Sequence, residues 1–160
     1  MERYDEILKN ELYVKHLEKT YEYEKDRIFC HHDMSHFLDV ARIGMLINLT
    51  DGYGISKDII YAAALLHDVG RDVQYENGTP HEIASAEIAE IILKDTDYTE
   101  DERRMILKAV KDHRDESVKD DNSLSGLIYR ADKLSRPCYY CRAEKECNHK
   151  KDKKNAFLIW

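Results

Sequence analysis

The chain has 160 residues, 42% of them hydrophobic and 36% charged, and a formal charge of −7. That length suits one domain with its own apolar core. The excess of acidic residues argues against a long nucleic acid as partner, because phosphate binding needs a surplus of Lys and Arg. No apolar run approaches the roughly 18 residues of a membrane helix, and the N-terminus lacks the apolar stretch of a signal peptide. We therefore expect a cytoplasmic protein without a membrane partner.

The pattern of apolar residues predicts an all-α fold. Only six Gly and two Pro interrupt the chain, which favours helices over many short strands. Apolar residues recur at helical spacing in six segments. These segments are 1–27 (with Val14, Leu17 and Tyr21 on the apolar face and a break near Thr20), 29–49, 56–70, 81–94, 100–114 and 123–136. Residues 75–80 read as a polar turn, and the apolar residues 156–160 are expected to dock on the domain.

Capping residues support these helix boundaries. A short polar side chain before a helix satisfies its free N–H groups, and Pro ends a helix at or before the preceding residue. The candidate caps are Asp33 (or Ser35), Ser56, Thr79 ahead of Pro80, Thr99 paired with Glu102, and Ser123 (or Asn122), while Pro137 ends the last helix.

His67 and Asp68 are the first candidates for chemistry. They follow the apolar run AAALL and should therefore be buried. A buried carboxylate is costly unless it is paired or binds a metal, and His and Asp together offer a nitrogen and an oxygen ligand to one cation. The alternative is a hydrogen-bonded His–Asp pair with no metal.

Other histidines and one aspartate lie near the ends or apolar stripes of the remaining helices. They are His36, His81, His113 and Asp132, one on each of four helices. Any one of them alone is an ordinary polar residue. Their shared placement indicates that the helices bring them to one site with His67 and Asp68.

In order and context, these motifs resemble the HD-domain metal-dependent phosphohydrolases. The resemblance runs from about His32 to Pro137 and rests on HFLDVA, LLHDVGR, PHEIASAEIA, KAVKDH and YRADKLSR. The layout is similar to that of the bacterial dinucleoside tetraphosphate hydrolases. It differs from the HD-GYP branch, because Arg114 follows the last histidine and no GYP motif is present.

The resemblance implies a compact helical HD domain over residues 31–137. Residues 1–30 would form an amphipathic helical segment before it, and residues 138–160 a cysteine-containing extension packed on it. It also implies that His36, His67, Asp68 and Asp132 hold one divalent cation (Mn, Fe, Co, Ni or Mg). His81 and His113 would hold a second cation, with Asp68 bridging the pair.

This ligand set suits hydrolysis of a phosphoester or phosphoanhydride in a small nucleotide, since a divalent ion activates water and screens phosphate charge. Asp68 and Arg71 are the candidate catalytic residues. Arg71, Lys133 and Arg114 are the candidate phosphate contacts, with solvated surface charges as the alternative. Asp72 is a candidate proton shuttle, or else a helix-end carboxylate facing water.

The remaining histidines carry weaker expectations. One of His31 and His32 could face the pocket. His16 reads as a surface residue of an amphipathic helix, and His149 as part of a polar tail.

Four cysteines, Cys30, Cys138, Cys141 and Cys147, suggest a second metal site. Reducing conditions in the cytosol disfavour disulfides, and Cys138 and Cys141 have the spacing of a zinc knuckle. Cys30 precedes His36 and Cys138 follows Asp132 by six residues each, so the thiols should lie on one side of the fold. We predict a structural zinc there, to which His149 could also contribute; an iron–sulfur cluster and free or redox-sensing thiols are the alternatives.

Two further functional classes remain open from the sequence. A di-iron oxygenase would use the same six ligands, and a non-catalytic sensor would bind a nucleotide or report redox state without turnover.

Overall fold

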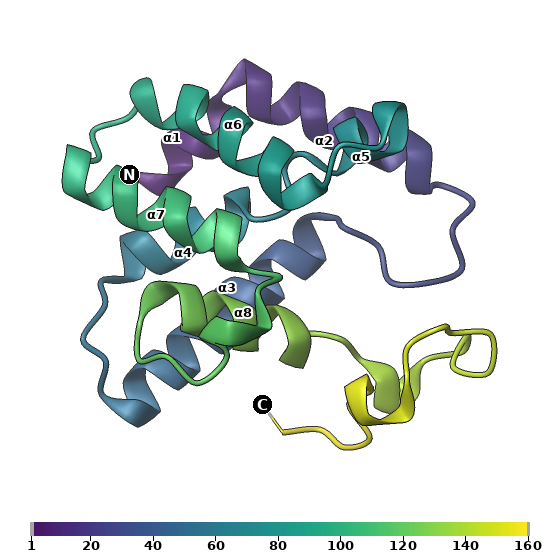
Figure 1. The fold of residues 1–160 in the computed structure, drawn as a ribbon. Coiled ribbons are helices and arrows are strands. Elements are labelled where there is room, and N and C mark those ends of the chain that lie inside the picture. Colours follow the sequence, from purple (N-terminus) through teal and green to yellow (C-terminus); the bar gives the residue numbers. More distant parts are fainter. Residues whose placement is uncertain (1, 160) are drawn as a thin grey trace.

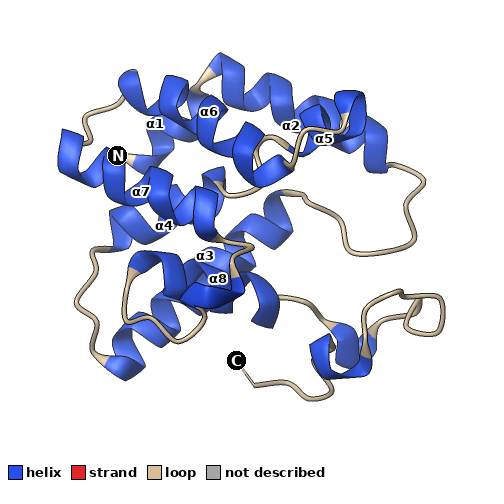
Figure 2. Ribbon diagram, in the orientation of Figure 1, coloured by secondary structure: helices blue, strands red, loops and turns tan. Residues whose placement is uncertain are grey.

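The computed structural model describes residues 2–159, and these form helices with no β-strand (Figure 2). The α-helices are α1 (Tyr4–Lys9), α2 (Glu11–Glu24), α3 (Met34–Asp51), α4 (Lys57–Leu66), α5 (Arg71–Asn77), α6 (His81–Lys94), α7 (Glu100–Asp112) and α8 (Leu124–Leu134). Short 3₁₀ turns follow as η1 (Glu116–Val118), η2 (Cys138–Tyr140) and η3 (Lys151–Lys153). The predicted all-α class is confirmed.

Helix α4 is the centre of the bundle. Seven of its ten residues are buried, including the whole run Ala62–Leu66, and it contacts α1, α3, α6, α7 and α8. In Figure 1, α3 and α8 lie on one side of α4, while α1, α2, α5 and α6 lie on the other. His67 and Asp68 directly follow α4, so the most buried helix delivers them to the middle of the molecule.

Side-chain caps begin several helices as predicted. The Asp33 carboxylate accepts from the backbone N–H of His36, which fixes the start of the helix that carries this histidine. Thr99 and Glu102 form a full capping box, and Ser123 caps α8. Ser56 precedes α4 without a side-chain bond.

The N-terminal region breaks at a different residue from the one predicted. The interruption lies at Asn10, whose side chain accepts from the N–H groups of Leu12 and Tyr13 and so caps α2, whereas Thr20 is buried within that helix. The apolar face is also shifted by one residue. Tyr13 is buried, and Val14 and Tyr21 are exposed.

Helix α5 was missed by the sequence reading, which placed a polar turn from Tyr75. The helix ends at Gly78, which adopts the left-handed conformation with φ of 83°. Pro80, not Thr79, is the N-cap residue of α6 and makes no side-chain bond. Helix α5 packs between α2 and α6, and this contact with neighbouring helices stabilises a short, polar segment that has no strong helical pattern.

The C-terminal segment, residues 138–159, has little regular structure and extends from the end of α8 (Figure 1). The Asn155 amide donates to the carbonyls of Lys133, Leu134 and Arg136 at 2.8–3.3 Å, which ties the segment back to α8. The described residues of the apolar ending, Phe157, Leu158 and Ile159, line a small groove with Ile43 and Leu46 of α3, but they remain 64–79% exposed. Among the described residues, no helix is long and apolar enough to cross a membrane.

Close packing at Gly70 positions the residues after Asp68. A Cβ atom added at Gly70 would lie 2.5 Å from the backbone nitrogen of Ser85 in α6, so the start of α5 and helix α6 approach too closely for any side chain. We predict that Gly70→Ala lowers the free energy of unfolding by about 1–3 kcal/mol, as overpacking usually does. Urea denaturation followed by circular dichroism measures this.

Gly44→Ala is the matched control. Its added Cβ would lie 3.2 Å from Cγ2 of Ile60 and at ordinary contact distances of 3.7 Å and 3.9 Å from side-chain atoms of Ala131 and Leu127, without a backbone clash. Ala also stabilises a helix relative to Gly. Equal destabilisation by the two substitutions would contradict the packing argument at Gly70.

Candidate metal centre

Five helices bring six side chains to one place in the interior. His36 comes from α3, His67 and Asp68 from the end of α4, His81 from the start of α6, His113 from the end of α7 and Asp132 from α8. They form two groups of three, His36–His67–Asp132 and Asp68–His81–His113, in which the ligand atoms all lie within 4.8 Å of one another. These are the six residues that the sequence singled out as candidate ligands.

The first group has the geometry of an ion site. Nε2 of His36 lies 3.2 Å from Nε2 of His67, and Oδ1 of Asp132 lies 3.5 Å and 3.8 Å from these two nitrogens. Ligands bound at about 2.1 Å to one ion stand about 3 Å apart when adjacent and about 4.2 Å apart when opposite. The observed separations fall within this range.

Asp68 joins the two groups through its two carboxylate oxygens. Oδ2 lies 3.4 Å from Nε2 of His67 and 3.8 Å from that of His36. Oδ1 lies 3.1 Å from Nε2 of His81 and 3.4 Å from that of His113. Oδ1 is buried and accepts no hydrogen bond from the described protein, and such an oxygen is costly unless a cation pairs with it. The chemistry of this carboxylate therefore suits one ion on each side.

The histidine rings are oriented for metal binding through Nε2. Nδ1 of His67 and of His113 each donates to a backbone carbonyl, at 2.7 Å and 2.6 Å. A proton on Nδ1 leaves the lone pair on Nε2, which is the usual arrangement for a metal-ligating histidine. Nδ1 of His81 lies between an acceptor, Oε1 of Gln74 at 2.6 Å, and a donor, Nη1 of Arg71 at 3.0 Å. Nε2 of His81 lies 3.2 Å from Nε2 of His113, so one cation could contact both rings.

Burial and neighbouring charges shift the pKa values of the histidines and carboxylates of the site in different directions. Burial lowers the pKa of His67 to about 3 and also lowers the pKa of His81, so both are neutral at pH 7. For His36, the carboxylates of Asp68 and Asp132 outweigh burial and raise the pKa. Burial opposes ionisation of Asp68, but the positive charges that face it, Arg71 among them, outweigh burial and hold its pKa well below the ordinary value. Anionic carboxylates and neutral imidazoles are the forms that bind metal.

The three candidate phosphate contacts all line the same pocket but differ in availability. Arg71 is only 18% exposed and its guanidinium contacts Nε2 of His32. Lys133 lies 2.5 Å from Oδ2 of Asp132. Arg114 is half exposed and pairs with Glu82 at 3.2 Å.

Two predicted surface groups lie in the interior instead. Asp72, expected to face water, is fully buried on α5, and its carboxylate receives a 2.8 Å contact from Nδ1 of His16. His16, expected at the surface, is 14% exposed. The pair joins α2 to α5, so a proton-shuttle role for Asp72 at the metal centre has no support. The unforeseen α5 accounts for both errors.

Of the two histidines before α3, His32 faces the site. It is buried, whereas His31 is exposed. Nδ1 of His32 lies 2.5 Å from Oε1 of Glu24, a residue that was not predicted to take part. Glu24 lies four residues after Thr20 and seven after Leu17, both buried, so its place on the buried face of α2 was the available signal.

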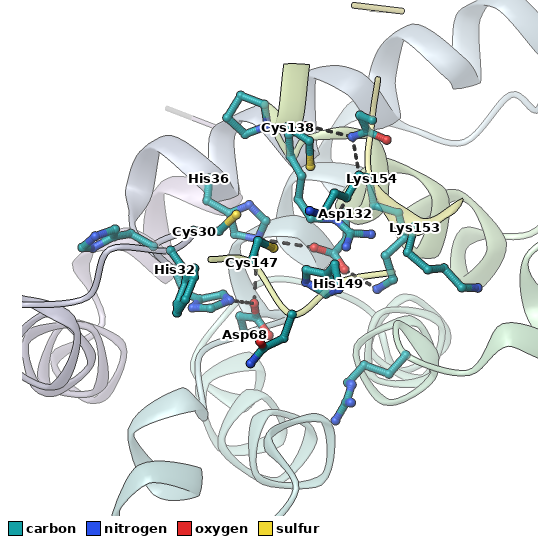
Figure 3. Close-up of a pocket in the computed structure, with 18 of the residues that line it drawn as sticks. Cys30, His32, His36, Asp68, Asp132, Cys138, Cys147, His149, Lys153 and Lys154 are labelled. Atoms are coloured by element: carbon teal, nitrogen blue, oxygen red, sulfur yellow. Dashed lines mark hydrogen bonds and ion pairs between the residues drawn. The ribbon is translucent and has the colours of Figure 1, made fainter. Parts of the chain in front are cut away.

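The four cysteines lie on one side of the same pocket, with His149 nearby (Figure 3). All four are free thiols and partly buried. Burial, together with the neighbouring Cys138 and Cys141, raises the pKa of Cys30. However, within the described part of the chain, no three of these sulfur and nitrogen atoms come within 4.8 Å of one another. The four cysteines therefore line the same pocket, but their sulfur atoms are not gathered as the ligands of one ion would be.

A model of the HD domain matches residues 33–136, about two thirds of the chain. The chain belongs to the HD-domain family. HD domains are in general metal-dependent hydrolases of phosphoesters, and the two His/Asp groups lie within the matched region.

The chain matches the full length of one relative and only a small part of two others. A protein of Clostridium beijerinckii described as uncharacterized is 48% identical over all of both chains. Ribonuclease Y of Mycoplasma mycoides and that of Mycoplasma capricolum are 28% and 26% identical over 64% of this chain, which is 18% of each ribonuclease. No solved structure matches the chain.

The bridging position of Asp68 predicts different losses for two carboxylate substitutions. Because Asp68 faces both groups, Asp68→Ala should weaken binding of both ions by about 100-fold or more. Asp132→Ala should weaken only the ion beside His36 and His67. Titration calorimetry with Mn²⁺ measures the number of ions and their affinities.

Asp39→Ala is the control, since the side chain of this aspartate is about half exposed on α3 and belongs to neither ligand group. Loss of a single ion in Asp68→Ala, with the other bound as in the unaltered protein, would contradict the bridging arrangement.

Proposed function

We propose that this protein is a phosphohydrolase that cleaves a phosphoester or phosphoanhydride bond of a small nucleotide with two divalent ions. The observation that carries the proposal is the Asp68 carboxylate, which faces one ligand group with each oxygen. His36, His67 and Asp132 would complete one ion site, and His81 and His113 the other. Mn, Fe, Co, Ni and Mg all suit a donor set of imidazole and carboxylate.

In such a reaction Asp68 would bind the ions, and Arg71 would bind the phosphate. Bound divalent ions supply an activated water and neutralise charge on the phosphate oxygens. Asp68 holds the two ion sites at a fixed separation. Arg71 lies beside it, with Nε 3.8 Å from Oδ2, and can turn its fork of N–H donors to phosphate oxygens. Nε of Arg71 is buried and has no hydrogen-bond partner in the described protein, so a donor is ready for such a ligand.

The charge of the pocket favours a compact anion as substrate. The chain has 32 acidic and 25 basic residues, but the pocket, about 890 Å³ in volume, reverses this balance. Eight Lys and Arg and five Asp and Glu line it. The cations are Arg27, Arg71, Arg114, Lys119, Lys133, Arg136, Lys153 and Lys154. A small phosphate-bearing molecule fits this local excess of positive charge, which a deep pocket focuses.

The ribonuclease relatives raise RNA as a second type of substrate. A long RNA is less favoured, because the overall charge of −7 would repel a polyanion that extends past the pocket. A dinucleotide or a nucleoside polyphosphate meets only the basic pocket.

Phosphate release from a panel of nucleotides tests this function. The panel includes nucleoside monophosphates, dinucleoside polyphosphates, alarmone-like nucleotides and a short RNA, each with Mn²⁺. We expect turnover of at least one small nucleotide and a loss of about 10³-fold or more in Asp68→Ala, because the metal-activated water is lost. Circular dichroism confirms that the variant is folded.

Other outcomes would redirect the assignment. Full activity in Asp68→Ala would remove this site from the reaction. Two irons per chain, with oxygen consumed and no phosphate released, would indicate an oxygenase. Metal binding without turnover of any nucleotide would indicate a sensor.

We also propose that Cys30, Cys138, Cys141 and Cys147 hold a structural zinc ion. The thiols come from the segment before α3 and from the C-terminal segment, and both line one wall of the pocket. A zinc ion would draw the four sulfurs together and join these segments. Thiols that remain free suit a cytoplasmic protein, where they stay reduced.

Cys141→Ser tests the zinc proposal. We expect loss of one zinc per chain and a lower melting temperature, with the ions at Asp68 retained, as measured by elemental analysis and calorimetry. Tyr140→Ser is the control, since Tyr140 is 83% exposed. Zinc content unchanged by Cys141→Ser, or an iron–sulfur absorption spectrum in the purified protein, would overturn the zinc site.

A further inference from the structure

His32 lies at the metal centre although it belongs to neither group of three. It directly precedes the first turn of α3, its side chain is 10% exposed, and its Nε2 lies 3.7 Å from Oδ2 of Asp68 (Figure 3). The same oxygen lies 3.4 Å from Nε2 of His67 and 3.8 Å from Nε2 of His36, so the distance to His32 falls between these two. His32 is thus slightly closer to this oxygen than the proposed ligand His36 is.

A buried glutamate holds the His32 ring in place. Oε2 of Glu24 accepts the backbone N–H of His32 at 2.7 Å, and Oε1 lies 2.5 Å from Nδ1 of the ring. The Tyr75 hydroxyl donates to Oε1 at 2.7 Å. The backbone N–H and the ring of His32 and the Tyr75 hydroxyl thus converge on the two oxygens of Glu24. This surrounding of donors suits a carboxylate acceptor.

The Glu24 contact determines which nitrogen of His32 carries a lone pair. A carboxylate only accepts hydrogen bonds, so Nδ1 of His32 is protonated and donates to it. Nε2 of the neutral ring then carries the lone pair and points toward Asp68. A metal-ligating histidine commonly donates its other N–H to a carboxylate or carbonyl, as His67 and His113 donate to carbonyls here. His32 shares this arrangement with the proposed ligands.

We propose that His32 is a further ligand, through Nε2, of the ion on the Oδ2 side of Asp68, and that Glu24 positions it. The inference rests on the proposed function for the existence of that ion. It adds a residue from outside the helices that carry the other six side chains, because His32 is contributed by the connection between α2 and α3.

Ligation by His32 would also affect Arg71. The guanidinium of Arg71 now donates to Nε2 of His32, so Arg71 and a metal ion compete for one lone pair. With Nε2 of His32 bound to an ion, Nη2 of Arg71 would be free of this contact and could donate to a phosphate oxygen. Metal loading and phosphate recognition would thus be coupled through His32.

Titration of the metal-depleted protein with Co²⁺ tests the proposal without reference to turnover. Its visible absorption reports the ligands around the ion, and calorimetry gives the affinities. In His32→Ala we expect about 10- to 100-fold weaker binding of one of the two ions and a changed spectrum, the effect typical of a lost ligand or ligand-supporting contact. Glu24→Gln should give a smaller loss at the same ion. His31→Ala is the matched control, because His31 is exposed and bonded to the Arg27 carbonyl.

Two Co²⁺ ions bound by a folded His32→Ala with unchanged affinities and spectrum would overturn the proposal. If His32→Ala does not fold, Glu24→Gln decides, and unaltered binding in that variant has the same meaning. Asp68→Ala in the same titration separates this inference from the proposed function. Loss of Co²⁺ in Asp68→Ala with none in His32→Ala refutes only the role of His32, whereas full binding in Asp68→Ala refutes the shared metal centre.

Discussion

The structure depends on one buried carboxylate. Asp68 lies at the end of the most apolar helix, and it is ionised in a place where an unpaired charge would cost several kcal/mol. Five imidazole nitrogens lie within 3.1–3.8 Å of its two oxygens. Four of them come from the end of α4 or from helices that pack on it, so the helices around the core are also the scaffold of the candidate metal centre. Stability and chemistry therefore constrain the same few positions.

Much of this arrangement could be predicted from the sequence, because it depends on patterns among residues that are close together in the chain. The apolar run before His67 indicates burial, and helix caps such as Asp33 fix where His36 faces inward. The six candidate ligands could be selected because each follows a pattern of this kind. The all-α fold also follows from apolar periodicity, a property of neighbouring residues.

The remaining features could not be predicted because they depend on contacts between distant segments. Helix α5 has a polar sequence and is stabilised by α2 and α6, so Asp72 and His16 were both misplaced. Glu24 lies on the buried face of α2, but its partners His32 and Tyr75 come from other segments of the chain. The apolar ending 156–160 suggested docking, yet the hydrogen bonds of Asn155 hold that segment while Phe157, Leu158 and Ile159 stay exposed.

The weak attachment of the C-terminal segment has an evolutionary consequence. Residues 138–155 supply a large part of the pocket wall, but they belong to no α-helix and contribute little to the apolar core. Substitutions there can change the shape and charge of the pocket at small cost to folding. Ligand preference can therefore diverge through these residues while the helices that carry the candidate ligands stay the same.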